Sequence, residues 1–194
     1  MTTPMLSPYR VLDLTDDRGD LAGYTLAQLG AEVISVEPPE GHPARHLGPF
    51  AGGNRDPDRS IRHWAHNRGK RSIIVDLTDH DGRNRLRRLV EGADVLIESA
   101  EPGAMTALGL GPDDLLAVNP ALVYASISAF GSDGPRARWR ASDLTIMASA
   151  SPLSHTGDSD RPPLRVSAPQ GFRFGAAAAV DGVITALLDR ARTG

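Results

Sequence analysis

The stretch YRVLDL at residues 9–14, with LAGYTLAQL at 21–29 and EVISV at 32–36, decides the fold predicted for this chain. The first and last of these segments are short apolar runs with β-branched residues, which is typical of buried strands. The middle segment has the length and pattern of a helix. A strand, a helix and a second strand in this order predict a βαβ unit with parallel strands.

The same alternation continues through the rest of the chain. Further strands are predicted at residues 72–75, 95–97 and 123–127, and further helices at 81–90, from 111 onward and at 175–188. Loops without periodicity are predicted at 38–59, 131–140 and 158–163. This order predicts an α/β fold with an open, mostly parallel, Rossmann-like sheet flanked by helices. We expect a single domain over residues 1–194, because the length suits one core and no linker or repeat divides it.

Composition and charge exclude several classes of function. Hydrophobic residues make up 40% and charged residues 23% of the chain, which is the balance of a globular protein. A formal net charge of −3 argues against nucleic-acid binding, which needs a basic surface. The absence of cysteine removes disulfides, thiolate metal sites and cysteine nucleophiles. We find no apolar run near the roughly 20 residues that span a bilayer, and no secretory signal, so we expect a cytoplasmic protein without membrane contact.

Three common active-site motifs are not met. The turn after the first strand, DDRGDLAG at 16–23, lacks G-x-G-x-x-G, and its aspartates would repel the pyrophosphate of NAD(P). His63 and His66 are spaced to share a helix face, but no third ligand stands at a metal-binding spacing, so no metal site is predicted. No G-x-S-x-G elbow supports a serine hydrolase.

A basic cluster is the strongest ligand signal among the individual residues. The segment NRGKR at 67–71 contains Arg68, Lys70 and Arg71 and leads directly into the predicted strand at 72–75. Arginine offers a planar fork of donors and lysine a point charge, and both suit a phosphate-rich ligand. A solvated turn at the start of a strand explains the same residues equally well, so the sequence leaves both interpretations open.

An ordered series of sequence blocks resembles class III CoA-transferases, the CaiB/BaiF family. The blocks are RVLDLT (10–15), LGAEVISVEPP (29–39), NRGKRS (67–72), ADVLIES (93–99), PGAM (102–105), NPALVYASI (119–127), FGSDGP (130–135) and PLRV (163–166). The resemblance implies the fold of the family's large domain and CoA as substrate or ligand, with no separate cofactor. It also implies that this chain is the N-terminal part of a longer family chain that pairs as a homodimer or with a family paralogue.

The resemblance further implies a set of CoA-binding residues. By position, the basic cluster would lie near the nucleotide end of CoA, and the segment after the fourth strand would line the path of adenine and pantetheine. The expected residues are Arg68, Lys70, Arg71, Glu98, Ser99, Ala100, Pro102, Gly103 and Met105. The segment SAE at 99–101 departs from the Asn-Phe-Arg that is common in the family, which removes an aromatic wall and a cation.

The family's catalytic position holds a residue that cannot perform the family's chemistry. Family enzymes carry an aspartate after a PLRV-type stretch, and its carboxylate attacks the acyl-CoA thioester to form a mixed anhydride. Aligned on PLRVSAPQG at 163–171, this position is Phe172, which has no nucleophile. If the chain were active alone, Asp143 and Asp181 would be the first carboxylates to test.

Two hypotheses therefore follow from the resemblance. In the first, the chain is a CoA-transferase of this family that moves CoA between carboxylic acids, or a subunit of one whose activity rests on a catalytic partner chain. In the second, it is a non-catalytic subunit that binds acyl-CoA or supports a catalytic paralogue. The acyl group and the acceptor acid are not specified by the sequence.

Overall fold

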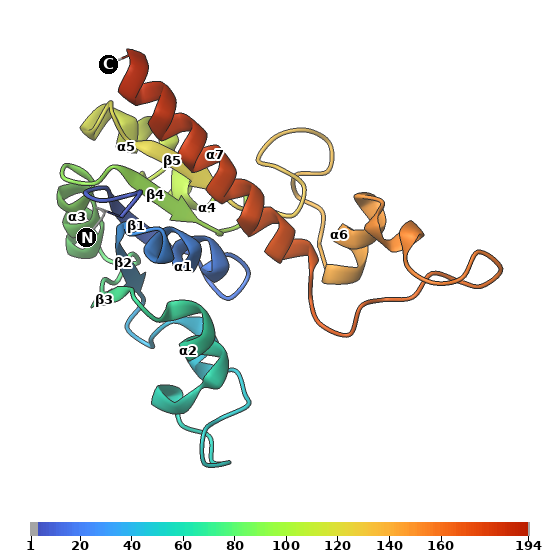
Figure 1. The fold of residues 1–194 in the computed structure, drawn as a ribbon. Helices are drawn as coiled ribbons and strands as arrows, with labels where there is room; N and C mark the ends of the chain where they lie inside the picture. Colours follow the sequence, from blue (N-terminus) through green and yellow to red (C-terminus); the bar gives the residue numbers. More distant parts are fainter. Residues whose placement is uncertain (1–3, 194) are drawn as a thin grey trace.

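Five strands form one parallel sheet at the centre of the molecule (Figure 1). The structure, a computed structural model, describes residues 4–193. The strands are β1 (Arg10–Leu14), β2 (Glu32–Glu37), β3 (Arg71–Ile74), β4 (Val95–Glu98) and β5 (Val123–Ser126). Their order in the sheet is β3-β2-β1-β4-β5, and every neighbouring pair is parallel. The predicted open, parallel α/β sheet is confirmed.

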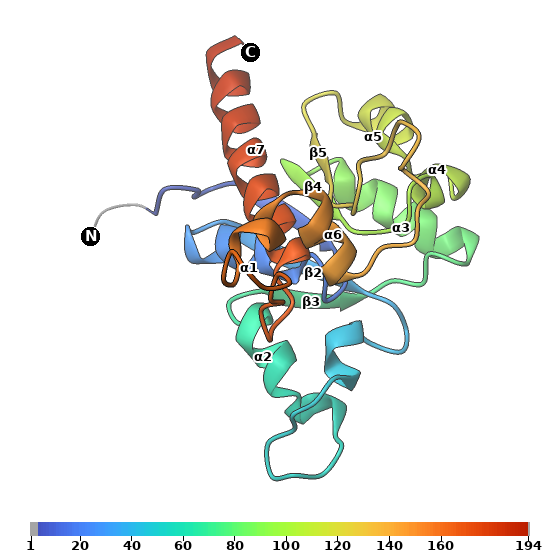
Figure 2. The same cartoon turned by 90° about the vertical axis from the view of Figure 1, so that its right-hand side faces the viewer.

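Helices connect the strands and cover both faces of the sheet. They are α1 (Asp20–Gln28), α2 (Ile61–Asn67), α3 (His80–Val90), α4 (Ala104–Ala107), α5 (Pro112–Val118), α6 (Asp143–Ser149) and α7 (Gly171–Thr193). Figure 2 shows α1 and α7 on one side of the sheet and α3, α4 and α5 on the other. Of the helices that the sequence did not predict, α2, α4 and α6 have seven residues or fewer, too short for a clear periodic signal.

The two faces of the sheet carry two apolar cores. Successive side chains of a strand point to opposite faces, so Val11 of β1 packs with α1 and α7 while Leu12 packs with α3 and α5. In β4, Val95 and Ile97 join the first core and Leu96 joins the second. All four β4 residues are buried, as expected for a central strand covered on both faces.

Residues 38–59, predicted to be a loop, contain short helical turns. The turns are η1 (Pro43–His46) and η2 (Pro57–Arg59), and an isolated bridge joins Phe50 to Ser60. The buried carboxylate of Glu37, at the end of β2, holds this segment in place. It accepts hydrogen bonds from the Arg45 guanidinium at 2.7 and 2.9 Å, the Ser72 hydroxyl at 2.6 Å and the His42 backbone N–H at 2.8 Å. Periodicity could not predict this ordered structure, because hydrogen bonds from residues far apart in the chain to one buried carboxylate hold the segment in place.

Helix α7 is longer than predicted, and its apolar residues are used in packing. The prediction covered residues 175–188, but the helix begins at Gly171 because Asp143 Oδ1 accepts the backbone N–H groups of Gln170 and Gly171, both at 2.6 Å. By length and composition alone α7 could span a membrane, contrary to the sequence expectation. From Ala176 onward, however, its buried residues recur every three or four positions and pack on α1 and β5. These residues are Ala176, Val180, Val183 and Leu187.

A buried ion pair joins β1 to the residue directly before β3. Lys70 Nζ lies 2.7 Å from Asp13 Oδ2, and both side chains are almost fully buried. The same ammonium donates to the backbone oxygen of Asp20 and to Asn67 Oδ1, each at 2.9 Å. Helix α1 approaches the pair so closely that a Cβ at position Gly23 would overlap Asp13 Oδ2. All three donors of the lysine are therefore used inside the protein.

Breaking this pair is expected to destabilise the fold. In Lys70→Met the Asp13 carboxylate stays buried without its partner, which costs about 3–5 kcal/mol of unfolding free energy. The matched control is Arg71→Gln, because Arg71 is largely exposed and pairs with Glu32 at the surface, where a loss below about 1 kcal/mol is expected. Urea unfolding measures both. Equal, small losses in the two variants would contradict the structural role of Lys70.

The buried side chain of His63, on α2, makes the free energy of unfolding depend on pH. Burial, followed by the nearby Arg45 charge, lowers the pKa of His63 from 6.5 to about 4. Because the folded state resists protonation, the contribution of His63 to stability is complete above pH 6.5 and is lost as the pH falls towards 4. In His63→Gln the unfolding free energy should fall less steeply over this range, whereas His80→Gln, at an exposed histidine, should behave like the unchanged protein. Identical pH profiles for all three proteins would show that His63 does not contribute.

Candidate functional site

A crevice is expected where the strand order reverses. The chain enters the sheet at β1, proceeds outward through β2 and β3, and then crosses to β4 on the other side of β1. The loops that follow β1 and β4 therefore leave in opposite directions at the carboxyl edge of the sheet. In open α/β sheets, ligands bind at this topological switch point.

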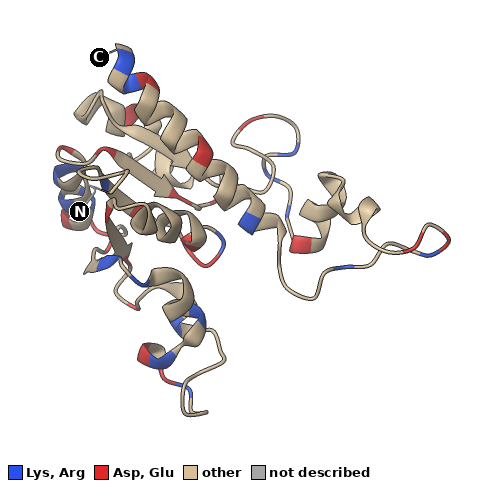
Figure 3. Cartoon of the chain, viewed as in Figure 1, with Lys and Arg blue, Asp and Glu red and all other residues tan. Residues whose placement is uncertain are grey.

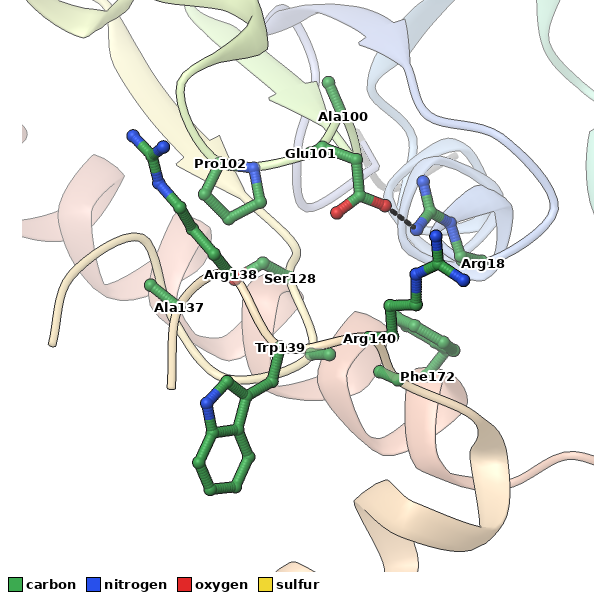
Figure 4. A pocket seen from close by; sticks show the side chains of 12 residues that line it. Arg18, Ala100, Glu101, Pro102, Ser128, Ala137, Arg138, Trp139, Arg140 and Phe172 are labelled. Carbon is green, nitrogen blue, oxygen red and sulfur yellow. Dashed lines mark hydrogen bonds and ion pairs between the residues drawn. The ribbon is translucent and has the colours of Figure 1, made fainter. Parts of the chain in front are cut away.

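A cavity of about 450 Å³ lies at this position (Figure 4). We call it the switch cavity. It is bounded by the loops after β1, β4 and β5 and by the first turn of α7. Its lining residues are Arg18, Ala100, Glu101, Pro102, Ser128, Ala129, Ala137, Arg138, Trp139, Arg140, Ala141 and Phe172. The lining combines three arginines with two aromatic side chains, which suits an anionic ligand that also has an apolar part.

Arg18 ties the two diverging loops together. Its Nε donates to the two Asp16 carboxylate oxygens at 2.9 and 3.1 Å, and its Nη1 donates to Glu101 at 3.0 Å. Its Nη2 donates to the backbone oxygen of Ser99 at 2.7 Å. The hydrogen bond to Asp16 is the main reason why the pKa of Arg18 is raised. The guanidinium therefore cross-links the β1 and β4 loops, and its charge is largely compensated.

Phe172 forms one wall of the switch cavity. It is the second residue of α7, and the Arg18 guanidinium carbon lies 5.5 Å from the centre of its ring. On the other side of the ring lies a smaller cavity of about 200 Å³, which the side chains of Arg62 and His66 also line. An aromatic ring at this place supplies packing and a cation–π contact. It supplies no group that can attack a thioester.

The two carboxylates considered as substitutes lie in different surroundings. Asp143 lines the smaller cavity beside Phe172, but its Oδ1 caps the start of α7 through the two 2.6 Å hydrogen bonds from Gln170 and Gly171. Asp181 is exposed on α7, and it lies nine positions after Phe172, which is about 13 Å along the helix axis. Asp181 is therefore remote from the switch cavity.

An apolar groove continues from the switch cavity along the same edge of the sheet. Its volume is about 420 Å³, and it lies beside the ends of β1, β2 and β3 and against α4. Its lining residues are Leu14, Val36, Pro38, Pro39, Glu40, Val75, Asp76, Leu77, Thr78, Ala100, Ala104, Met105 and Leu108. Ala100 lines both spaces, so the groove and the cavity adjoin at the end of β4.

Comparison with known proteins identifies the family. The sequence profile of CoA-transferase family III matches residues 6–194. The chain belongs to this family. The resemblance found in the sequence is thereby confirmed.

Two named enzymes and one crystal structure that are similar to this chain support the family assignment. The chain is 38% identical over 188 residues to "Succinyl-CoA:(R)-benzylsuccinate CoA-transferase subunit BbsE" of Thauera aromatica, covering 97% of this chain and 46% of that protein. It is 38% identical over 187 residues to the acetyl-CoA:oxalate CoA-transferase of Acetobacter aceti, covering 95% and 47%. A CaiB/BaiF family crystal structure from Brucella suis matches with a TM-score of 0.90 at 38% identity, covering 100% of this chain and 51% of that one. The chain thus spans about half the length of these relatives.

The structure brings the strand-end part of the expected CoA set together. Ala100 and Pro102 line the switch cavity, and Met105 lines the apolar groove. Glu98, Gly103 and Met105 also line a third cavity of about 420 Å³ on the α5 side. Burial raises the pKa of Glu98, which accepts a 2.6 Å hydrogen bond from the Ala100 backbone N–H.

Ser99 serves the scaffold. It is buried, and its hydroxyl exchanges hydrogen bonds with Asp16, accepting from the backbone N–H at 2.8 Å and donating to Oδ1 at 2.9 Å. These contacts hold the β1 loop against the β4 loop, beside the bonds made by Arg18. Ser99 thus supports the edge that borders the switch cavity and is not among its lining residues.

The basic cluster lies on the other side of β1 from β4, directly before β3. It precedes β3, which pairs with the last four residues of β2, and the Lys70 ammonium reaches Asp13 and the backbone oxygen of Asp20, whereas Ala100 follows the carboxyl end of β4. That the two groups bind one CoA molecule remains a prediction. Lys70 forms the buried ion pair with Asp13, and Arg71 pairs with Glu32. Arg68 stacks on Tyr24, with 5.1 Å between its guanidinium carbon and the ring centre.

Sequence reasoning missed the arginines of the switch cavity. Arg138 and Arg140 lie in the segment predicted as a loop at 131–140, which is confirmed as free of helix and strand. Figure 3 shows the basic residues along this segment between β5 and α6. The signal was present in RARWR at 136–140, but a charge run in a loop looks like an ordinary solvated surface. Arg18 was not predicted as a site residue, because the aspartates around it argued against an anion site in that turn.

Proposed function

We propose that this chain binds an acyl-CoA along the carboxyl edge of its sheet, as part of a CoA-transferase that moves CoA between carboxylic acids. The observation that carries the proposal is the pair of adjoining spaces that share Ala100, one apolar and one lined by arginines. An apolar slot suits the flat face of adenine, and a polar cavity suits the reacting thioester and acid. The names of the relatives, which are CoA-transferases, support the same chemistry.

The position of Phe172 sets the direction in which the CoA lies. The family resemblance puts the reacting group at this residue, which lines the switch cavity. The thioester would therefore enter the switch cavity, the pantetheine would pass Ala100, and the adenosine would reach the groove near Met105. The basic cluster takes no part in this arrangement, because Lys70 and Arg71 are paired with Asp13 and Glu32.

The nucleophile is proposed to come from a partner chain. In the family chemistry a carboxylate attacks the thioester carbonyl, the CoA thiolate leaves, and a mixed anhydride remains on the enzyme until the thiolate returns. Phe172 cannot take that first step, and Asp143 is held as the cap of α7. A family paralogue with an aspartate at the matching position would provide the missing carboxylate. The relative from Thauera aromatica is itself named as a subunit of a CoA-transferase, which is consistent with such an assembly.

A second candidate is a non-catalytic subunit that only binds acyl-CoA. The contact of Arg18 with the Phe172 ring favours this second candidate. The cation–π contact stabilises an aromatic side chain at the position where a catalytic subunit would carry its nucleophile. The two candidates differ in one measurement. The first candidate requires that adding this chain increase the rate of CoA transfer by a catalytic paralogue, and that the increase depend on the CoA site of this chain. The second candidate requires only that this chain bind acyl-CoA.

Binding of CoA should depend on the junction at Ala100 and not on the basic cluster. In Ala100→Trp the indole would fill the junction of the groove and the switch cavity, so acetyl-CoA affinity should fall at least about tenfold, equivalent to about 1.4 kcal/mol. The control is the double variant Arg68→Glu with Arg71→Glu, which reverses charge at the basic cluster and should bind acetyl-CoA like the unchanged chain. Titration calorimetry measures both. The reverse pattern would place the phosphates at the basic cluster, and no binding by the unchanged chain would reject the proposed function.

No covalent intermediate should form on this chain alone. After incubation with acyl-CoA, trapping with hydroxylamine or borohydride should leave every side chain unmodified in a mass spectrum, because Phe172 offers no nucleophile. Phe172→Asp tests the position itself, and any modification found should map to the new aspartate. Transferase turnover by the purified, unchanged chain would contradict the proposal and direct attention to Asp143.

A further inference from the structure

A buried carboxylate in the smaller cavity beside Phe172 has an oxygen that the described protein does not use. Asp20 lines this cavity and is only 2% exposed. Its Oδ1 lies 3.3 Å from Nδ1 of His66, which also lines the cavity, so the carboxyl group stands at the cavity wall. Its Oδ2 is buried and has no hydrogen-bond partner among residues 4–193. Because a buried carboxylate oxygen without a donor is costly, a hydrogen-bond donor from a ligand would be stabilising there.

The cations around Asp20 are engaged elsewhere. Of the arginines that line the smaller cavity, Arg62 lies 3.2 Å from Asp17 Oδ2, and the charge of Arg18 is compensated by its two ion pairs. The Lys70 ammonium donates to the backbone oxygen of Asp20 and not to its carboxylate. Within the described structure, Asp20 therefore has no permanently charged partner, and a cationic group of a ligand would fill that role.

The same cavity has one cation to spare. Arg173, the third residue of α7, lines the cavity and is exposed, and its guanidinium makes no hydrogen bond or ion pair with residues 4–193. A guanidinium has donors only, in a planar fork that matches a carboxylate through two parallel N–H···O bonds. The smaller cavity thus combines an acceptor without a donor and a cation without an anion.

The volume of the cavity limits the size of its ligand. At about 200 Å³ it equals the share of roughly seven water molecules, and it is smaller than the cavities of roughly 300–1,000 Å³ that hold drug-sized ligands. Leu21 and the Phe172 ring provide an apolar part of the wall. A short carbon chain that carries charged groups suits these dimensions.

We propose that the smaller cavity binds a small amino acid, whose ammonium group donates to Asp20 Oδ2 and whose carboxylate pairs with Arg173. The ammonium supplies both the donor and the positive charge that the buried carboxylate lacks, whereas a hydroxyl group would supply only the donor. The carbon chain between the two charged groups would pack against Leu21 and Phe172. This site is separate from the proposed acyl-CoA path, although Arg18 and Phe172 border both, so its occupancy can be measured without acyl-CoA.

The probes are glycine, β-alanine and 4-aminobutyrate, which carry the same two charged groups at increasing separation. Titration calorimetry at millimolar concentration compares each probe with the acid and the amine that lack one of its groups, which for β-alanine are propionate and ethylamine. The tightest of the three should bind about tenfold or more tightly than its acid, because the ammonium bonds to a buried carboxylate. It should bind about threefold or more tightly than its amine, a smaller gain because Arg173 is exposed.

Two variants test the two contacts separately. Asp20→Asn removes the buried negative charge and should abolish the preference over the acid, and Arg173→Gln should abolish only the preference over the amine. The matched control Arg192→Gln changes another exposed arginine of α7, 19 positions and about 28 Å further along the helix, and should leave every affinity unchanged. Thermal melting shows whether each variant is folded. Because Arg173 is exposed, Arg173→Gln keeps the test decisive if Asp20→Asn unfolds.

Several results would overturn this inference without touching the proposed function. They are the absence of binding by all three amino acids, an acid or an amine that binds as tightly as its amino acid, and preferences that persist in folded Asp20→Asn and Arg173→Gln. The proposed function is tested by acetyl-CoA binding and by Ala100→Trp. A failure of acetyl-CoA to bind would reject that function and leave the amino-acid site standing.

Discussion

Hydrogen bonding of β1 to β2 on one side and to β4 on the other is the constraint on which the site depends. Val11 pairs with both Val33 and Val95, so the first strand of the chain becomes the middle strand of the sheet. The loops that follow β1 and β4 must then separate at the carboxyl edge, and the space between them is the switch cavity. Arg18 spans this separation, because it bonds to Asp16 on one loop and Glu101 on the other.

The cations of this protein divide into two kinds according to burial. Lys70 lies in the interior, where its charge is stable only because Asp13 and two further acceptors surround it. Arg138 and Arg140 lie in solvent, where an arginine needs no protein partner and remains available to a ligand. A basic residue that supports the fold and one that binds a substrate can therefore look alike in sequence and differ completely in surroundings.

Phe172 determines how the site can be used. Its ring lies between two cavities and under the Arg18 guanidinium, so the wall at this position is apolar and well packed. The nearby carboxylate of Asp143 is occupied with the first N–H groups of α7, and its removal would disturb the helix that carries Phe172. Under the proposed function, the carboxylate nucleophile therefore comes from outside this set of residues.

The sequence by itself determined the fold class and the family. Alternating apolar strands and helices predicted the parallel sheet, since strand pairing and burial follow from local periodicity of the kind seen in EVISV at 32–36. The sequence also pointed to Ala100 and Met105, because they follow a recognisable strand in a family-like block. Only the tertiary structure decided that Lys70 is buried against Asp13 and that Arg140 lies beside Phe172. Both relations join residues that are far apart in the chain, and no local pattern records which distant side chain will neutralise a charge and which charge will remain open to a ligand.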